Sequence, residues 1–133
     1  MALLLDTHVW VWAMEDPDRL GPHTLGLLEN DKNSLYVSTI SSLEIARLIV
    51  VGRLKLKGAL SAWVGESLAA LQSGSLEVSH DVAIGAYSLP GEFHRDPADR
   101  VLVSTARCHD LRLLTADERI LQYPFVKSQD VRL

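Results

Sequence analysis

The chain has 133 residues, of which 47% are apolar and 23% charged, and its 13 basic and 17 acidic side chains give a net charge of −4. These proportions are typical of an ordinary folded protein that can bury one core without metal or disulfide support, so we expect a single domain over residues 1–133. The acidic balance excludes a protein that binds nucleic acid through its overall charge; such binding would need a local basic patch or bound cations.

The cysteine content and the apolar runs indicate where the protein works. The single cysteine, Cys108, cannot form an internal disulfide, which favours a reducing, cytoplasmic setting, and we expect it to be a small buried side chain. No apolar run approaches the ~20 residues of a membrane span, and the start MALLLD meets an acid too early for a signal peptide. We therefore expect a soluble cytoplasmic protein with no membrane association.

Short apolar runs alternate with segments of helical periodicity along the whole chain. In chain order we predict a strand at Ala2–Leu5, helices at His8–Met14 and Pro22–Asn30, a strand at Leu35–Ser38, helices at Ser42–Val51 and Leu60–Leu71, a strand at Leu76–Val78, helices at Asp81–Ser88 and Pro97–His109, a strand at Leu111–Leu114, a short helix at Ala116–Gln122 and a weakly patterned strand at Phe125–Lys127. This alternation predicts a three-layer α/β/α sandwich with a mainly parallel central sheet. The first strand, ALLL, lacks polar alternation, as expected of a strand buried on both faces.

Acidic residues recur where predicted strands turn into helices. Asp6 directly follows the first strand, and Glu44 lies in the first turn of the helix after the second. Asp96 and Asp99 open the long helix, and Asp117 follows the strand LRLLT. Because parallel strands end at one edge of a sheet, and sites in such folds form outside that edge, we expect these acids to converge.

Helix capping explains two of these acids without any chemistry. Asp6 can cap the first helix, since aspartate is a favoured N-cap residue. Glu44 fits a capping box that begins at Ser41, or can pair with Arg47 three residues later.

The stretch HRDPADR, residues 94–100, is equally typical of a helix start. Asp96 would be the capping side chain, Pro97 the first helical residue and Asp99 the third. A further capping box, Thr115 to Glu118, would use Glu118 and leave Asp117 free.

Capping does not require several segments to bring their acids to one place. Two unit charges ~5 Å apart repel by roughly 3 kcal/mol at an effective dielectric of ~20, so a cluster needs a compensating cation. Oxygen ligands favour Mg²⁺ or Mn²⁺ over zinc, and no two histidines have zinc-ligand spacing. Two of the histidines, His8 and His94, lie close enough in sequence to contact a substrate at this site.

Three motifs, LLLDTHVWVW, STISSLEIARLIVVGRLKL and HRDPADRVLVSTARCHDLRLLTADERI, resemble the PIN-domain family. Within that family they are similar to the VapC-type toxins of bacterial toxin–antitoxin pairs. The resemblance spans nearly the whole chain and keeps the motif order. One departure is Leu43, where many relatives have tryptophan, and it affects packing only.

The resemblance implies a magnesium-dependent endoribonuclease. It also implies a homodimer and a cognate antitoxin whose C-terminal segment binds an apolar groove. The implied acidic quartet, with Thr115 as a polar neighbour, would bind the metal and carry out catalysis, and its members are Asp6, Glu44, Asp99 and Asp117.

Other interpretations remain open at this point. A receiver-like phospho-acceptor domain also gathers acids and Mg²⁺ at strand ends, but it would want adjacent acids after the first strand, where Thr7 follows Asp6. A non-catalytic partner-binding module would use the acids only as caps. The basic stretch GRLKLKG, residues 52–58, is either a solvated turn or a strip for a phosphate backbone.

Overall fold

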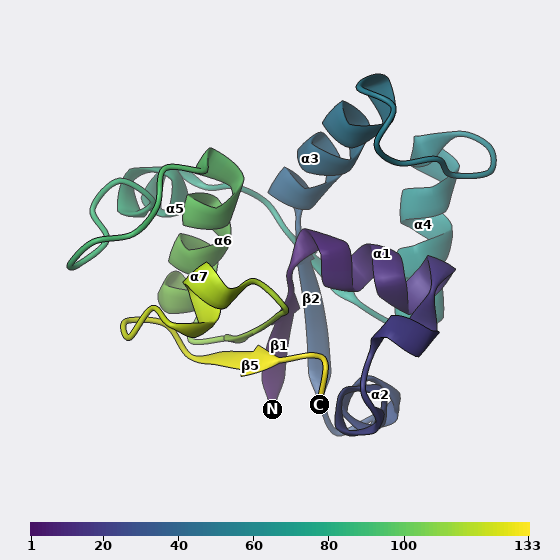
Figure 1. The fold of residues 1–133 in the computed structure, drawn as a ribbon, viewed down its shortest axis with the longest axis horizontal. Coiled ribbons are helices and arrows are strands. Elements are labelled where there is room, and N and C mark those ends of the chain that lie inside the picture. Colours follow the sequence, from purple (N-terminus) through teal and green to yellow (C-terminus); the bar gives the residue numbers. More distant parts are fainter.

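The computed structural model describes all residues, 1–133, and contains a five-stranded sheet in the order β3-β2-β1-β4-β5 (Figure 1). Every neighbouring pair of strands is parallel. The strands are β1 (Ala2–Leu5), β2 (Ser34–Ser38), β3 (Gly74–Leu76), β4 (Arg112–Thr115) and β5 (Ser128–Asp130). The α-helices are α1 (Thr7–Glu15), α2 (Pro22–Glu29), α3 (Thr39–Val50), α4 (Leu60–Leu71), α5 (His80–Gly85), α6 (Pro97–Cys108) and α7 (Glu118–Leu121), with a short 3₁₀ helix, η1 (Pro17–Arg19).

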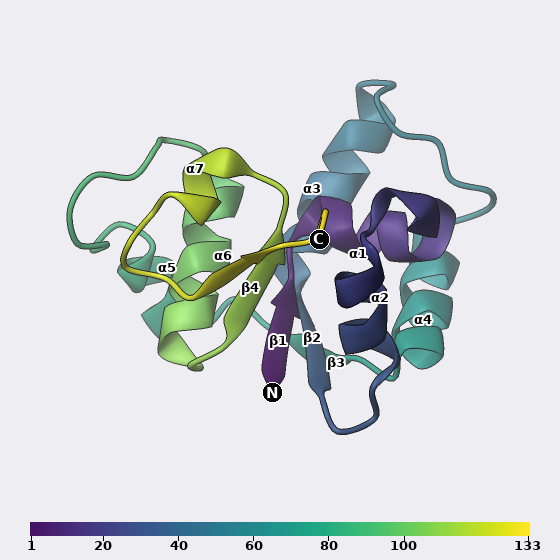
Figure 2. The ribbon, with the colours of Figure 1, turned by 60° about the horizontal axis from the view of Figure 1, so that its bottom comes forward.

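The predicted three-layer α/β/α sandwich is confirmed. Along β1, Leu3 and Leu5 enter one apolar cluster with α1 and α4, while Leu4 enters a second cluster with α6. Figure 2 shows the two helical layers on opposite sides of the sheet, with α1, α2 and α4 on one side and α5 and α6 on the other. The continuous apolar run of β1 follows from this double burial.

The two edge strands differ most from the sequence prediction. The third strand was expected at Leu76–Val78 and the last at Phe125–Lys127, but they form at Gly74–Leu76 and Ser128–Asp130. Pairing sets their position, because Gly74 lies opposite Tyr36 and Asp130 opposite Thr115. The chain of β5, Ser-Gln-Asp, is entirely polar, so no hydrophobic pattern marks it.

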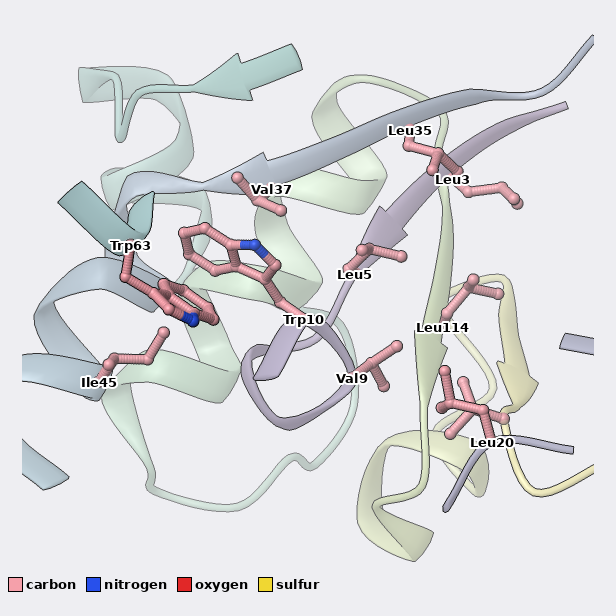
Figure 3. Packing of buried hydrophobic residues seen from close by; sticks show 11 residues of the cluster. Leu3, Leu5, Val9, Trp10, Leu20, Leu35, Val37, Ile45, Trp63 and Leu114 are labelled. Carbon is pink, nitrogen blue, oxygen red and sulfur yellow. The ribbon is translucent and has the colours of Figure 1, made fainter. Parts of the chain in front are cut away.

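Two tryptophans anchor the larger apolar cluster (Figure 3). The rings of Trp10 on α1 and Trp63 on α4 lie 4.9 Å apart, and the Trp10 indole Nε1 donates a 3.0 Å hydrogen bond to Ser67 Oγ. Both side chains are buried. Ile45 of α3 packs in the same cluster, which fixes α3 against α1.

The helix α6 has a strong apolar stripe that ends before its last turn. Residues 101–106 are all buried, whereas Cys108 is exposed. The prediction of a buried cysteine is therefore wrong, because Cys108 lies beyond the segment that faces the sheet. None of the helices combines the length and apolar character needed to cross a bilayer.

The strand order reverses at one place in the sheet, between β1 and β4. From β1 the chain moves outward to β2 and β3, then returns across the sheet to β4 on the other side of β1. The connections that leave β1 and β4 therefore diverge to opposite sides. In open parallel sheets, sites form at such a reversal.

Core burial predicts a large difference between two leucines. Leu4 is fully buried, whereas Leu43 on α3 is 66% exposed. Leu4→Ala should lower the free energy of unfolding by about 2–5 kcal/mol through lost burial and a residual cavity. Leu43→Ala, the matched control, should change it by less than about 0.5 kcal/mol. Urea unfolding followed by circular dichroism measures both, and equal losses would contradict the assignment of Leu4 to the core.

Candidate active site

Asp6 lies at the reversal point, directly after β1, and is 2% exposed. Its Oδ1 accepts a 2.7 Å hydrogen bond from the backbone N–H of Thr7, so it caps α1. Its Oδ2 accepts a 2.6 Å hydrogen bond from the hydroxyl of Thr115, the last residue of β4. The start of α1 and the end of β4 thus each donate one hydrogen bond to the Asp6 carboxylate.

At the start of α6, Asp96 and Asp99 have different roles, as the HRDPADR motif predicts. Asp96 Oδ1 accepts a 3.1 Å hydrogen bond from the backbone N–H of Asp99, which makes Asp96 the N-cap with Pro97 as the first helical residue. The Asp99 side chain caps nothing and is buried, with the residue 8% exposed.

The capping of α7 differs from the capping box predicted from the sequence. The predicted capping box would have left Asp117 free, but the Asp117 side chain caps α7 through a 2.9 Å hydrogen bond from the backbone N–H of Arg119. The Asp117 backbone N–H in turn donates to Thr115 Oγ1 at 2.9 Å. Thr115 therefore links Asp117 to Asp6.

Glu44 lies farther along its helix than expected. The helix α3 begins at Thr39 with Ser38 as its cap, so Glu44 belongs to the second turn and the capping box from Ser41 does not form. The Ser41 hydroxyl instead hydrogen-bonds the Thr7 hydroxyl at 2.8 Å. Burial raises the pKa of Glu44, the Thr7 side chain lowers it, and Asp6 adds to the rise.

Asp99 is buried close enough to the other acids to be affected by their charges. Burial, followed by the charges of four carboxylates, raises the pKa of Asp99 to about 8. In decreasing order of effect, these carboxylates are Asp6, Asp96, Asp117 and Glu44. The structure thus brings all four predicted site acids together, and it adds Asp96, which the sequence analysis treated only as a cap.

Asp117 stays charged within this cluster because Arg119 compensates it. Burial alone would raise the pKa of Asp117, but hydrogen bonds and charge from Arg119 outweigh that effect and lower it. The Arg119 Nη2 lies 3.2 Å from Asp117 Oδ2 and 3.9 Å from Asp99 Oδ2. No sequence motif marks Arg119 as part of the site, although Arg119 stands only two residues after Asp117.

Two histidines border the acids. His94 Nε2 lies 3.0 Å from Asp99 Oδ2, but the ring is not oriented for a hydrogen bond, so this buried nitrogen has no partner. His8 Nε2 accepts a 3.0 Å hydrogen bond from the backbone N–H of Ala116, and its Nδ1 lies 3.5 Å from Asp6 Oδ2. His8 therefore ties the segment after β4 to Asp6, whereas His94 remains available.

The basic stretch after α3 is a surface loop. Arg53, Lys55 and Lys57 are exposed, and Leu54 and Leu56 between them pack against the core. The loop begins at the end of α3 remote from its Thr39 end, so it does not contribute to the acid cluster.

The donor set fits a divalent cation that prefers oxygen. Ligand atoms of His94, Asp99 and Asp117 lie within 4.8 Å of one another, and Asp6 adjoins them through Thr115. A buried carboxylate whose pKa is raised by four others is the arrangement that a cation would stabilise. Carboxylate oxygens are the ligands of Mg²⁺ and Mn²⁺ in proteins.

The sequence profile of the PIN domain matches residues 3–126. The chain belongs to the PIN domain family. It is 33% identical over 118 residues to Ribonuclease VapC22 of Mycobacterium tuberculosis, and the match covers 89% of this chain and 88% of that protein.

Solved structures show the same fold at lower sequence identity. A chain of VapBC2 from Rickettsia felis, bound to a DNA fragment from its promoter, has a TM-score of 0.70 and 20% identity, and covers 97% of this chain and 98% of its own. A chain of DNA-bound VapBC from Salmonella typhimurium has a TM-score of 0.69 and 17% identity, with 98% of both chains covered. A chain of VapBC-1 from Haemophilus influenzae has a TM-score of 0.64 and 13% identity, with 98% of both covered.

Membership of the PIN family confirms the resemblance carried by the three sequence motifs. It also favours a nuclease over the receiver-like and partner-binding alternatives. The receiver-like alternative lacks the second acid that it would want after β1, since the residue after Asp6 is the buried Thr7, whose hydroxyl is engaged with Ser41.

The raised pKa of Asp99 predicts that metal-free protein loses stability as pH rises. Asp99 has a pKa of 3.8 when unperturbed and about 8 in the fold, so between these values the folded state holds the extra proton. The free energy of unfolding should therefore fall with rising pH, by at most about 1.4 kcal/mol per pH unit. Thermal unfolding in EDTA from about pH 5 to about pH 8 measures the slope.

Asp99→Asn should flatten this slope, because asparagine does not titrate. Asp31→Asn, which changes an exposed aspartate outside the cluster, is the control and should leave the slope unchanged. An equally steep slope in Asp99→Asn would show that Asp99 is not the group responsible.

Proposed function

We propose that this PIN domain is a Mg²⁺- or Mn²⁺-dependent endoribonuclease that acts as the toxin of a toxin–antitoxin pair in the cytoplasm. The observation that carries the proposal is the burial of Asp99 among four other carboxylates, which raises its pKa to about 8. A cluster of this kind needs a cation, and the 33% identity to Ribonuclease VapC22 supports RNA as the substrate.

In the proposed site, Asp6, Asp99 and Asp117 hold the ion. Asp6 is oriented by Thr7 and Thr115, and Asp117 by the N-terminus of α7, so both carboxylates are fixed before a ligand arrives. A bound divalent ion supplies the positive charge that stabilises the phosphodiester in the transition state and makes an attacking water more acidic.

Glu44 has the properties of the proton acceptor. It lies in the second turn of α3 and caps no helix, and burial raises its pKa. A carboxylate with a raised pKa accepts a proton from water more readily than an ordinary glutamate. His94 Nε2, which is buried without a partner, can donate to a phosphate oxygen of the substrate.

The proposed partners follow from the relatives. The solved relatives include VapBC complexes and a toxin–antitoxin complex from Klebsiella pneumoniae, which supports a cognate antitoxin for this chain. We propose that the protein forms a homodimer because the family resemblance implies one. A groove of about 490 Å³ beside the acids, lined by Ile40, Leu43 and Pro97 among others, offers exposed apolar surface for either partner.

Cleavage should depend on a divalent ion. Purified protein should cut at least one RNA from a panel of structured RNAs in Mg²⁺ or Mn²⁺ and stop when EDTA is added. Asp99→Asn should reduce the rate by about 100-fold or more, the loss caused by removing one preorganised electrostatic group. Gel electrophoresis of end-labelled RNA measures the rates.

Asp96→Asn is the matched control for Asp99→Asn. Asparagine caps helices as well as aspartate does, so this variant keeps the capping bond to the Asp99 backbone and should keep substantial activity. Undiminished cleavage in EDTA would exclude the metal mechanism. An inactive Asp96→Asn with an active Asp99→Asn would reverse the assignment of the two aspartates.

The toxin role makes a separate prediction in cells. Induced expression of the wild-type chain should arrest bacterial growth, and Asp99→Asn, which lacks the site charge, should not. Co-expression of the neighbouring open reading frame should restore growth if that frame encodes the antitoxin. Colony counts after induction measure the effect, and growth arrest by Asp99→Asn equal to that of wild type would contradict a catalytic toxin.

A further inference from the structure

The guanidinium group of Arg119 lies beside the acid cluster and contacts both carboxylate oxygens of Asp117. Its Nε lies 3.3 Å from Asp117 Oδ1, and its Nη2 lies 3.2 Å from Asp117 Oδ2. The same Nη2 faces Asp99 Oδ2 at 3.9 Å. One guanidinium group therefore faces two carboxylates of the cluster.

The Arg119 side chain is 61% exposed, whereas the side chains of Asp117 and Asp99 are 20% and 11% exposed. Its backbone is fixed at the start of α7, but the long side chain is open to solvent and can leave the site at little cost. Arg132 provides a comparison, because it also pairs with two acids, but these are Glu118 and Asp130 on the outside of the cluster.

We propose that Arg119 is a tethered cation that occupies the place of the divalent ion in the metal-free protein and binds the RNA backbone once the ion has displaced it. This inference rests on the proposed function. An ion held by Asp99 and Asp117 would compete with the Arg119 guanidinium for the same two carboxylates. Metal binding would therefore weaken the Arg119 contacts.

The displaced side chain remains attached beside the acids. A guanidinium group is always charged, and its planar donors match the oxygens of a phosphate. It thus provides a local positive charge next to the site in a protein whose net charge is −4. Arg119 would bind the phosphate chain next to the cleaved bond, which the acids themselves repel.

The first test measures metal binding without RNA. Isothermal titration of EDTA-treated protein with Mn²⁺ should give a dissociation constant for Arg119→Gln about three- to tenfold lower than that of wild type, because the competing cation is gone. Arg119→Lys, which keeps the charge, should lie closer to wild type. Arg132→Gln, the matched control, should bind Mn²⁺ as wild type does.

The second test measures RNA binding in a Glu44→Gln background, in which the proposed proton acceptor is removed. Fluorescence anisotropy with a labelled mixed-sequence single-stranded RNA in Mg²⁺ should show weaker binding when Arg119→Gln is added, and the salt slope should fall by about 1. Adding Arg132→Gln instead should leave the affinity and the slope unchanged.

The outcomes separate this inference from the proposed function. Unchanged Mn²⁺ affinity in Arg119→Gln, or unchanged RNA affinity in the second test, overturns the role of Arg119 while leaving the nuclease intact. Absence of Mn²⁺ binding to the wild-type protein overturns the proposed function itself. Circular dichroism before each titration confirms that the variants are folded, as expected for changes at an exposed side chain.

Discussion

Mutual repulsion of carboxylates at the carboxyl edge of the sheet is the constraint on which the site depends. The fold buries Asp99 within reach of four other acids and thereby raises its pKa to about 8. Such crowding is opposed by a well-packed core, in which Leu3–Leu5 of β1 are fully buried and the rings of Trp10 and Trp63 pack against each other. The apolar core supplies the stability that the charged edge opposes.

Capping and ligand binding are not alternatives in this protein. Asp6 and Asp117 both cap helices, and both belong to the acid cluster. A capping hydrogen bond fixes the orientation of a carboxylate and leaves its remaining lone pairs free for a cation. Helix capping is often treated as an alternative to a functional role for an acidic residue. Here the capping hydrogen bonds themselves orient the carboxylates of the site before any ligand binds.

The groups that compensate the negative charge differ from one acid of the cluster to the next, which indicates distinct roles. The Asp6 carboxylate accepts hydrogen bonds from Thr7 and Thr115, and Asp117 is closely paired with Arg119. Asp99 has the Arg119 Nη2 only at 3.9 Å and a His94 Nε2 that makes no hydrogen bond. The charge of Asp99 is therefore less well compensated than that of Asp6 or Asp117. Similarity to solved structures at 13–20% identity accompanies TM-scores of 0.64–0.70, so this arrangement of layers tolerates wide changes in sequence.

The sequence by itself determined the sandwich, the central strands and the placement of Asp6, Asp99 and Asp117 at helix starts, because apolar runs and helix starts are local signals. It also separated Asp96 as cap from Asp99, since Asp-Pro-x-Asp defines the first turn. Only the tertiary structure decided the edge strands, whose polar residues are held by pairing with β2 and β4. It likewise placed Arg119 beside Asp99, an acid from another segment, and brought His94 Nε2 against Asp99 within its own stretch. It also showed that Asp117, not Thr115, caps α7. These contacts depend on how the strands are ordered and where α6 meets the sheet, and local sequence carries no record of either.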